Sequence, residues 1–102
     1  MFKAAILLKR KEGVSAEEFA DWWLNRHAPL ARDLPKVRRV VFNLVKDGPY
    51  DGISELWFDS EEALQQAYAS DHGKAVAADT LSMVAERIRL PVSEHVIKEM
   101  TP

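Results

Sequence analysis

The residue in this sequence that is best suited to proton transfer is His27. It follows Trp23 by four residues and precedes Leu30 by three, which places it on the apolar stripe of a helix with Phe19. Pro29 lacks a backbone N–H and crowds the preceding turn, so we expect the helix to kink or restart there. An imidazole beside such irregular backbone could act as general acid or base near neutral pH. A core histidine bonded to a carbonyl is the alternative.

A carboxylate and an amide on two neighbouring strands form a second group of candidates. Glu55 shares a strand face with Ile53 and Trp57, and a carboxylate between two large apolar side chains is either paired or has a raised pKa. A cross-strand pair with an arginine such as Arg39 explains Glu55 equally well. Asn43 could offer its amide to a ligand carbonyl, although it could also be an ordinary residue near a turn.

The tryptophans are candidates for the walls of a binding pocket. Trp22 and Trp23 are adjacent, so on a helix they point about 100° apart and only one of them can face a given site. Trp23 is four residues from His27, so we expect it at the site and Trp22 in the core. Trp57 is opposite in parity to Leu56, and we expect it to form an aromatic wall inside a barrel.

The other histidines and the missing motifs limit the chemistry. His72 precedes Gly73 in a polar break, where a lid or a solvated turn could form, and His95 is expected on a terminal strand at the surface or at a dimer edge. The histidines have no ligand-type partners at metal-binding spacing, so we expect no metal. No phosphate-binding or dinucleotide-binding glycine motif occurs among the 4 glycines, so we expect no cofactor.

The composition describes an ordinary globular domain. The chain has 102 residues, enough for one domain over 1–102, with 47% hydrophobic and 29% charged residues. The net charge of −2 and the absence of a basic tract argue against binding to nucleic acid or to an anionic membrane surface. Cysteine is absent, which excludes disulfides and thiolate chemistry. No apolar run is long enough for a membrane helix, and no cationic leader begins the chain, so we expect a cytoplasmic protein.

The elements that must position these residues alternate between strands and helices. A capping box at Ser15 and Glu18 begins the first helix, and a composition typical of turns joins the middle strands into a hairpin. In chain order we expect a strand over 2–10, a helix over 15–34, strands over 37–45 and 53–58, a helix from 60 to about 69, a break over 70–73, a short helical segment to about Asp79, and a strand over 87–99 that contains Pro91.

This β-α-β-β-α-β order predicts an α+β, ferredoxin-like fold with an antiparallel sheet and both helices on one face. The second face needs a cover, because Ile53 and Trp57 alternate with Leu56 and Phe58 and both faces are therefore apolar. A second copy of the chain, laid face to face, would provide that cover. We therefore expect a homodimer with a shared α/β barrel.

Three segments of the chain carry a familiar pattern, namely Lys9–Ser15 with Glu18-Phe19, Trp22-Trp23 and His27-Ala28-Pro29-Leu30-Ala31; Asp51–Phe58; and Ser70–Ala75 through Asp79. Together they are similar to the EthD family of dimeric α/β barrel proteins. The resemblance implies a ligand pocket in which His27 is the pocket histidine and which Asp79 faces. By its position alone, Asp79 would cap or end the short helix. Relatives span ether-degradation accessory proteins, a methylmuconolactone isomerase and polyketide-tailoring decarboxylases.

The resulting functional hypothesis is a protein that binds a small hydrophobic molecule in a barrel pocket. It could be a cofactor-free isomerase or decarboxylase in which His27 transfers a proton and Glu55 or Asn43 orients it. A non-catalytic accessory or ligand-binding dimer for a degradative oxidase is the alternative, and a monooxygenase on the same barrel is a weaker one.

Overall fold

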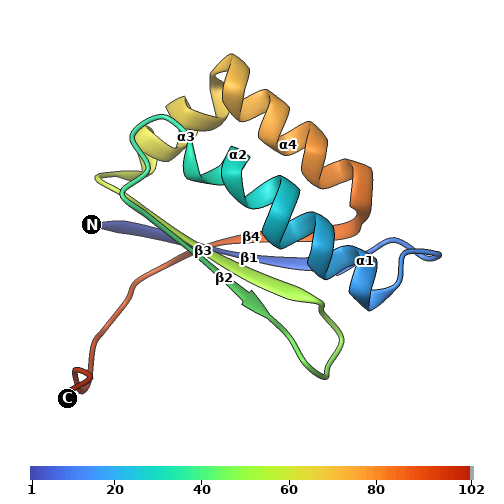
Figure 1. Ribbon diagram of the computed structural model, residues 1–102. Helices are drawn as coiled ribbons and strands as arrows, with labels where there is room; N and C mark the ends of the chain where they lie inside the picture. Colours follow the sequence, from blue (N-terminus) through green and yellow to red (C-terminus); the bar gives the residue numbers. More distant parts are fainter. Residues whose placement is uncertain (102) are drawn as a thin grey trace.

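The computed structural model of the protein, which describes residues 1–101, contains one antiparallel sheet with the helices on one of its faces (Figure 1). The strands are ordered β2-β3-β1-β4. This is the predicted ferredoxin-like α+β fold. The elements are β1 (Phe2–Arg10), α1 (Ala16–Asp21), the π-helix η1 (Trp22–His27), α2 (Ala28–Arg32), β2 (Arg39–Leu44), β3 (Gly52–Phe58), α3 (Glu61–Ala69), α4 (Asp71–Met83) and β4 (Val84–Val92).

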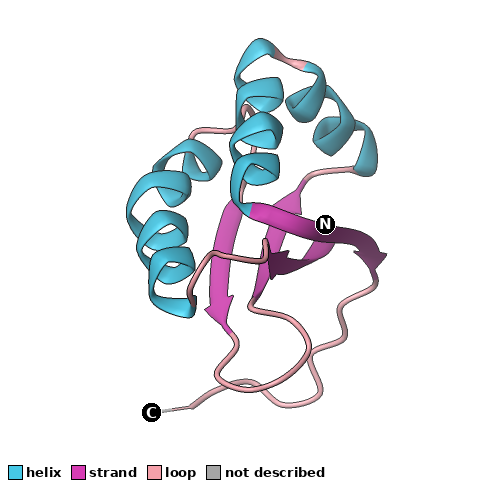
Figure 2. Cartoon of the chain, turned by 90° about the vertical axis from the view of Figure 1, so that its right-hand side faces the viewer, coloured by secondary structure: helices cyan, strands magenta, loops and turns pink. Residues whose placement is uncertain are grey.

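The register of the strands divides their side chains between two faces. Ala4 of β1 lies opposite Leu56 of β3, and Ile6 lies opposite Ser54. All four are buried beneath the helices, and we call this side the helix face. The alternate positions, such as Glu55 opposite Ala5, point to the other side, which we call the open face because no helix covers it (Figure 2). The prediction of two sheet faces from alternation is therefore confirmed.

The first helical run changes its winding just before Pro29. Ser15 caps α1 by accepting a hydrogen bond from the Glu18 N–H, while the Glu18 side chain accepts one from the Ser15 N–H. The chain then widens into η1 and continues as α2, in which Pro29 lies in the first turn. The Ala28 N–H bonds to the Trp23 carbonyl five residues back, which is the wide turn of a π-helix, and Pro29, which has no N–H to donate, follows directly. His27 is the last residue of the π-helix, and such irregular turns are frequent at functional sites.

The second helical region corrects the expected short segment after a break. Ser70 ends α3 and also caps α4, since its hydroxyl accepts from the Gly73 N–H and donates to the Ala67 carbonyl. Helix α4 then runs without interruption to Met83. Gly73 permits this sharp connection, because a Cβ there would lie 2.0 Å from the Ala67 carbonyl oxygen. Asp79 is therefore inside a long helix and neither caps nor ends it.

The last strand also begins and ends earlier than expected. Val84 already pairs with Arg10, after a bulge at Ala85 of β4, and the final pair is Lys3 with Val92. Because β1 begins at Phe2, residues beyond Val92 have almost no strand left to pair with. Pro91 is tolerated because β4 is at the edge of the sheet. Within residues 1–101, no helix is long and apolar enough to cross a membrane.

Candidate functional site

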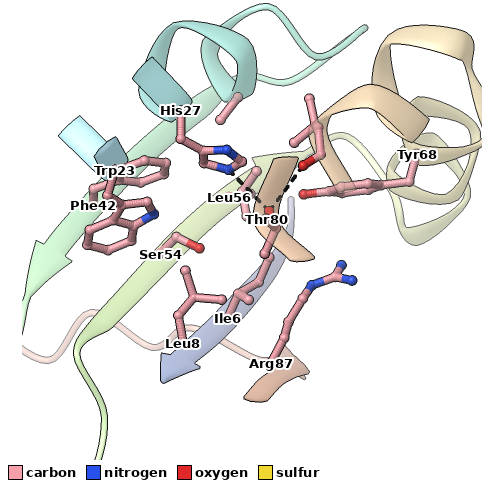
Figure 3. Close-up of a pocket in the computed structure, with 12 residues that line it drawn as sticks. Ile6, Leu8, Trp23, His27, Phe42, Ser54, Leu56, Tyr68, Thr80 and Arg87 are labelled. Carbon is pink, nitrogen blue, oxygen red and sulfur yellow. Dashed lines mark hydrogen bonds between the residues drawn. The ribbon is translucent and has the colours of Figure 1, made fainter. Parts of the chain in front are cut away.

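A small cavity lies between the helix face and the helices, and His27 is part of its wall (Figure 3). Its volume of about 20 Å³ has room for about one water molecule. Three of the lining residues are only partly buried, namely Phe42, Tyr68 and Arg87, so the cavity opens to solvent among them. A larger ligand would enter by displacing these side chains. The lining residues are Ile6, Leu8, Trp23, His27, Ala31, Phe42, Ser54, Leu56, Tyr68, Val76, Thr80 and Arg87.

His27 and Asp79 form a hydrogen-bonded pair behind the cavity wall. His27 is 4% exposed, and its Nδ1 is 2.7 Å from Asp79 Oδ2. An ionised carboxylate only accepts hydrogen bonds, so Nδ1 must carry a proton. The same Oδ2 accepts a second hydrogen bond from Trp22 Nε1, at 3.1 Å. These two contacts fix the imidazole in one orientation, with Nε2 as the nitrogen that remains available.

The Thr80 hydroxyl can serve both protonation states of that nitrogen. Thr80 Oγ1 is 3.3 Å from His27 Nε2 and 3.1 Å from the Val76 carbonyl oxygen. When the imidazole is neutral, the hydroxyl can donate to either Nε2 or the carbonyl, but not to both. When Nε2 is protonated, it donates to Thr80 while Thr80 donates to Val76. Thr80 can therefore contact Nε2 in both protonation states of His27 and leaves its lone pair accessible when the hydroxyl donates to Val76.

Burial lowers the pKa of His27 below its usual value, although the neighbouring Asp79 opposes this shift and Arg87 adds to it. Desolvation disfavours the charged imidazolium more than the carboxylate stabilises it. The resting form at neutral pH is therefore a neutral imidazole whose Nε2 lone pair can accept a proton. This is the state required of a general base.

Trp23 forms one wall of the cavity and has a polar atom without a partner. Its ring stacks on Phe42 at a centroid distance of 4.3 Å and packs against Gly52, where a Cβ would lie 2.6 Å from the ring. Among the described residues, Trp23 Nε1 is the only buried side-chain nitrogen or oxygen that lacks a hydrogen-bond partner. Figure 3 shows this nitrogen on the side of the ring nearer Ser54. Leaving such a donor unpaired costs about 1–3 kcal/mol, so a ligand acceptor here would relieve that cost.

The structure does not bring all the predicted site residues together. Trp23 and His27 line the cavity, and Asp79 lies directly behind His27. In contrast, Asn43 and Glu55 lie on the open face, on the other side of the sheet. Asn43 is paired with Ile53, and Ile53 and Glu55 are two residues apart on β3, so all three point to the same face. The expectation that they orient a proton on His27 would require a ligand to reach through the sheet.

Trp57 also lies on the open face and is buried, at 8% exposure, by its neighbours there. Lys3 and Arg39 lie over its ring at 4.6 and 4.7 Å from the centroid, and its Nε1 donates to Glu94 at 3.0 Å. The prediction that Trp57 faces away from the helices is confirmed. The cavity, however, is on the opposite face, so Trp57 is not part of its wall.

The partner of Glu55 is Lys3 and not Arg39. Lys3 Nζ is 2.7 Å from Glu55 Oε2, and Asn43 Nδ2 donates to Glu55 Oε1 at 3.0 Å. The hydrogen bond from Lys3 lowers the pKa of Glu55, with a further contribution from Asn43. Glu55 is therefore a paired carboxylate, which removes the alternative of a raised pKa.

The two remaining histidines lie outside the cavity. His72 is in the first turn of α4, and its Nε2 is 2.7 Å from the carbonyl oxygen of Leu30 in α2. It therefore connects two helices and is not part of a mobile lid. His95 follows β4 and does not lie on a strand; its Nε2 is 2.9 Å from Ser93 Oγ. In residues 1–101, no group of three or more side chains is arranged to hold a metal ion.

Sequence reasoning missed several lining residues with polar groups. Ser54 could have been assigned from its parity with Leu56, and Thr80 from its position next to Asp79. Arg87 and Tyr68 gave no such signal, because their positions depend on the register of β4 and on how α3 packs. Arg87 lies opposite Leu8, which is buried, and this register turns it toward the helix face.

The fold is shared with several solved structures. An EthD family protein from Bacillus halodurans matches with a TM-score of 0.79 and 26% identity, over 93% of this chain and 100% of that one. A dimeric ferredoxin-like protein of unknown function from Thermobifida fusca matches with a TM-score of 0.74 and 16% identity, over 91% and 90% of the two chains. SnoaB, a cofactor-independent oxygenase from Streptomyces nogalater, matches in an N63A mutant form with a TM-score of 0.70 and 13% identity, over 96% and 97%.

Sequence comparison adds to these structural matches. No curated protein matches this chain. The model of the EthD domain, however, matches residues 11–86, which include the whole first helical run, the hairpin and α4. The chain belongs to the EthD family.

Proposed function

We propose that this protein binds a small, mostly apolar molecule in the cavity beside His27 and transfers a proton on it without a cofactor. The observation that carries the proposal is the His27–Asp79 pair, in which a buried, neutral imidazole is held by a carboxylate with Nε2 free to react. This arrangement matches a general base whose conjugate acid is stabilised by a neighbouring charge. The apolar walls, such as Trp23 and Leu56, suit a hydrophobic ligand.

The proton transfer can be written with this chain's residues alone. His27 Nε2 takes a proton from a carbon beside a carbonyl group of the ligand, and the C–H electron pair moves toward the carbonyl oxygen to form an enolate. Asp79 accepts a hydrogen bond from Nδ1–H of the resulting imidazolium, and the Thr80 hydroxyl oxygen accepts one from Nε2–H. Returning the proton to a different carbon makes the protein an isomerase. In a decarboxylase no C–H bond is broken: the electron pair of the C–CO₂ bond stays on the carbon as CO₂ leaves, and His27, having taken a proton from water, delivers it to that carbon.

The test uses hydrogen–deuterium exchange, because exchange reports proton transfer whatever the later steps are. A thermal-shift screen of lactones, phenols and β-keto acids would identify ligands, which are then incubated with the protein in D₂O and followed by NMR. We expect catalysed exchange of a ligand C–H, slowed by about 10²–10⁴-fold in His27→Gln. Asp79→Asn should slow it less, since it changes only the orientation and stabilisation of the imidazole.

His95→Gln is the matched control, since His95 lies on the surface and its substitution should leave exchange unchanged. Ligand binding with no exchange in the wild type would instead support the non-catalytic, accessory role. Oxygen consumption with a bound ligand would favour an oxygenase. SnoaB, which shares this fold, is a cofactor-independent oxygenase.

We also propose that the open face is the interface of a homodimer. Leu7 of β1 lies opposite both Ile53 and Ile88, and no helix covers this apolar row. Two such faces packed together would form the barrel that we expect from the sequence. The solved structure from Thermobifida fusca is described as dimeric, which supports the proposal.

Light scattering at micromolar concentration tests the dimer. We expect a mass of about twice the 11.6 kDa of one chain. Leu7→Glu should yield monomers, because it places charge in the centre of the interface, whereas Leu24→Glu, on an exposed helical position, should leave the dimer intact. A monomeric wild type would remove the proposal.

A further inference from the structure

Arg87 is a charged residue without an opposite charge. It lies in β4, on the helix face, and lines the cavity with its side chain partly buried. Among residues 1–101, no carboxylate lies within ion-pairing distance of its guanidinium, and the guanidinium donates no hydrogen bond to another described residue. A partly desolvated cation without an opposite charge is costly, and an anion bound to its guanidinium would offset that cost.

Tyr68 adds a second free donor at the same opening of the cavity. The Arg87 guanidinium carbon is 5.9 Å from the centre of the Tyr68 ring, and the ring lies at the cavity wall (Figure 3). No hydrogen bond from the Tyr68 hydroxyl to another of the described residues is present. Burial raises the pKa of Tyr68, so the hydroxyl keeps its proton at neutral pH and can donate it.

The charge balance inside the cavity favours the same kind of ligand. Asp79 is the nearby carboxylate, but its Oδ2 already accepts hydrogen bonds from His27 and Trp22, and Asp79 does not line the cavity. The polar side chains that do line the cavity include the Arg87 cation and no carboxylate, while the hydroxyls of Ser54 and Thr80 can donate as well as accept. A ligand with one anionic oxygen group complements them.

We propose that Arg87 and Tyr68 form an oxyanion-binding subsite, and that the ligand of this cavity is a small planar apolar molecule carrying a carboxylate or an enolate oxygen. The apolar part of the ligand lies between Trp23 and Leu56, and its anionic oxygen meets the guanidinium at the opening. This inference rests on the proposed use of the cavity as a ligand site. In the proton transfer described above, the same pair of donors would hold the oxygen on which negative charge develops.

The test compares two probes of equal shape and different charge, 4-fluorobenzoate and 4-fluorobenzamide, by fluorine NMR titration of the full chain. Wild-type protein should bind the benzoate roughly tenfold or more tightly than the benzamide, because only the benzoate forms charge-assisted hydrogen bonds. Arg87→Gln should remove this preference while leaving benzamide binding nearly unchanged. Arg87→Lys should retain part of it, since lysine keeps the charge but loses the planar fork.

Arg89→Gln is the matched control. Arg89 lies on the same strand and face, and its guanidinium carbon is 5.2 Å from the Tyr68 ring centre, but it does not line the cavity. It should therefore keep the preference for benzoate. A melting curve for each variant separates loss of binding from loss of folding.

Each outcome distinguishes the inference from the proposed function. A preference for benzoate that survives in Arg87→Gln, or that disappears equally in Arg89→Gln, would overturn the subsite and leave the catalytic role of His27 standing. Failure of the wild type to bind either probe would overturn the subsite together with the cavity as a site for such ligands. Loss of exchange activity in His27→Gln with benzoate selectivity intact would support both.

Discussion

The two faces of the sheet contain similar polar residues that are used in different ways. On the open face, Lys3 pairs with both Glu55 and Glu94, and Glu94 also accepts from Trp57. On the helix face, Arg87 and the Trp23 N–H lack partners among the described residues, although they line a cavity. On the open face both carboxylates and the Trp57 N–H are therefore paired within the chain, whereas the helix face leaves donors that a ligand could bind.

This difference between the two faces helps to distinguish structural polar groups from functional ones. Glu55 looks like a functional carboxylate in the sequence, but its two oxygens are used by Lys3 and Asn43. His27 Nδ1 is likewise occupied, by Asp79, but the Thr80 hydroxyl is the one hydrogen-bonding group near its Nε2, and His27 lines the cavity. A site is indicated by polar atoms that remain unused, more than by the presence of reactive residue types.

The largest effect that tests this comparison is expected for Trp57→Ala. Trp57 is almost fully buried beneath Lys3 and Arg39, so truncation should lower the free energy of unfolding by about 3–5 kcal/mol, as measured in urea. Trp57→Phe keeps one aromatic ring beneath the two cations but loses the pyrrole part of the indole and the bond to Glu94, so it should cost less, about 1–2 kcal/mol. If Trp57→Ala left stability unchanged but abolished binding of 4-fluorobenzoate, the open face would be the ligand site.

A smaller effect is expected for Gly52→Ala, on the helix face. The added Cβ would lie 2.6 Å from the Trp23 ring, so the ring must move, at a cost of about 1–3 kcal/mol. The same substitution in a Trp23→Phe background should cost less, because the smaller ring leaves space. A double-mutant cycle from urea unfolding measures this coupling. Equal costs in the two backgrounds would show that the Trp23 ring does not depend on Gly52.

The sequence predicts the fold well because the fold depends on local patterns. The capping box at Ser15, the alternation in the third strand and the break before Pro29 each constrain their own segment. The assignment of Trp57 to the face away from the helices follows from parity alone. These features need no knowledge of long-range packing.

The site was harder to predict because it depends on register and packing. Alternation separates Glu55 from Leu56, but it does not say which face contains the cavity. Arg87 becomes a cavity residue only because β4 pairs with β1 so that Arg87 lies opposite Leu8. The contact of Asp79 with His27 spans 52 residues of sequence, and only the resemblance to a family placed Asp79 near the pocket.

The smallest expected effect concerns the pH dependence of stability, which separates a neutral His27 from a permanently charged one. Burial lowers the pKa of His27 in the folded protein, while in the unfolded chain it is about 6.5. The folded state therefore binds fewer protons between these two pKa values, so stability should fall as the pH falls through this window, by about 1.4 kcal/mol for each unit of difference. Urea unfolding between about pH 8 and pH 5 should show this loss in the wild type and in His95→Gln, but not in His27→Gln. A wild type that instead gains stability over His27→Gln as the pH falls would mean that the Asp79 charge outweighs burial. His27 would then rest as an imidazolium, paired like the charges of the open face, and its role as a base in the cavity would be withdrawn.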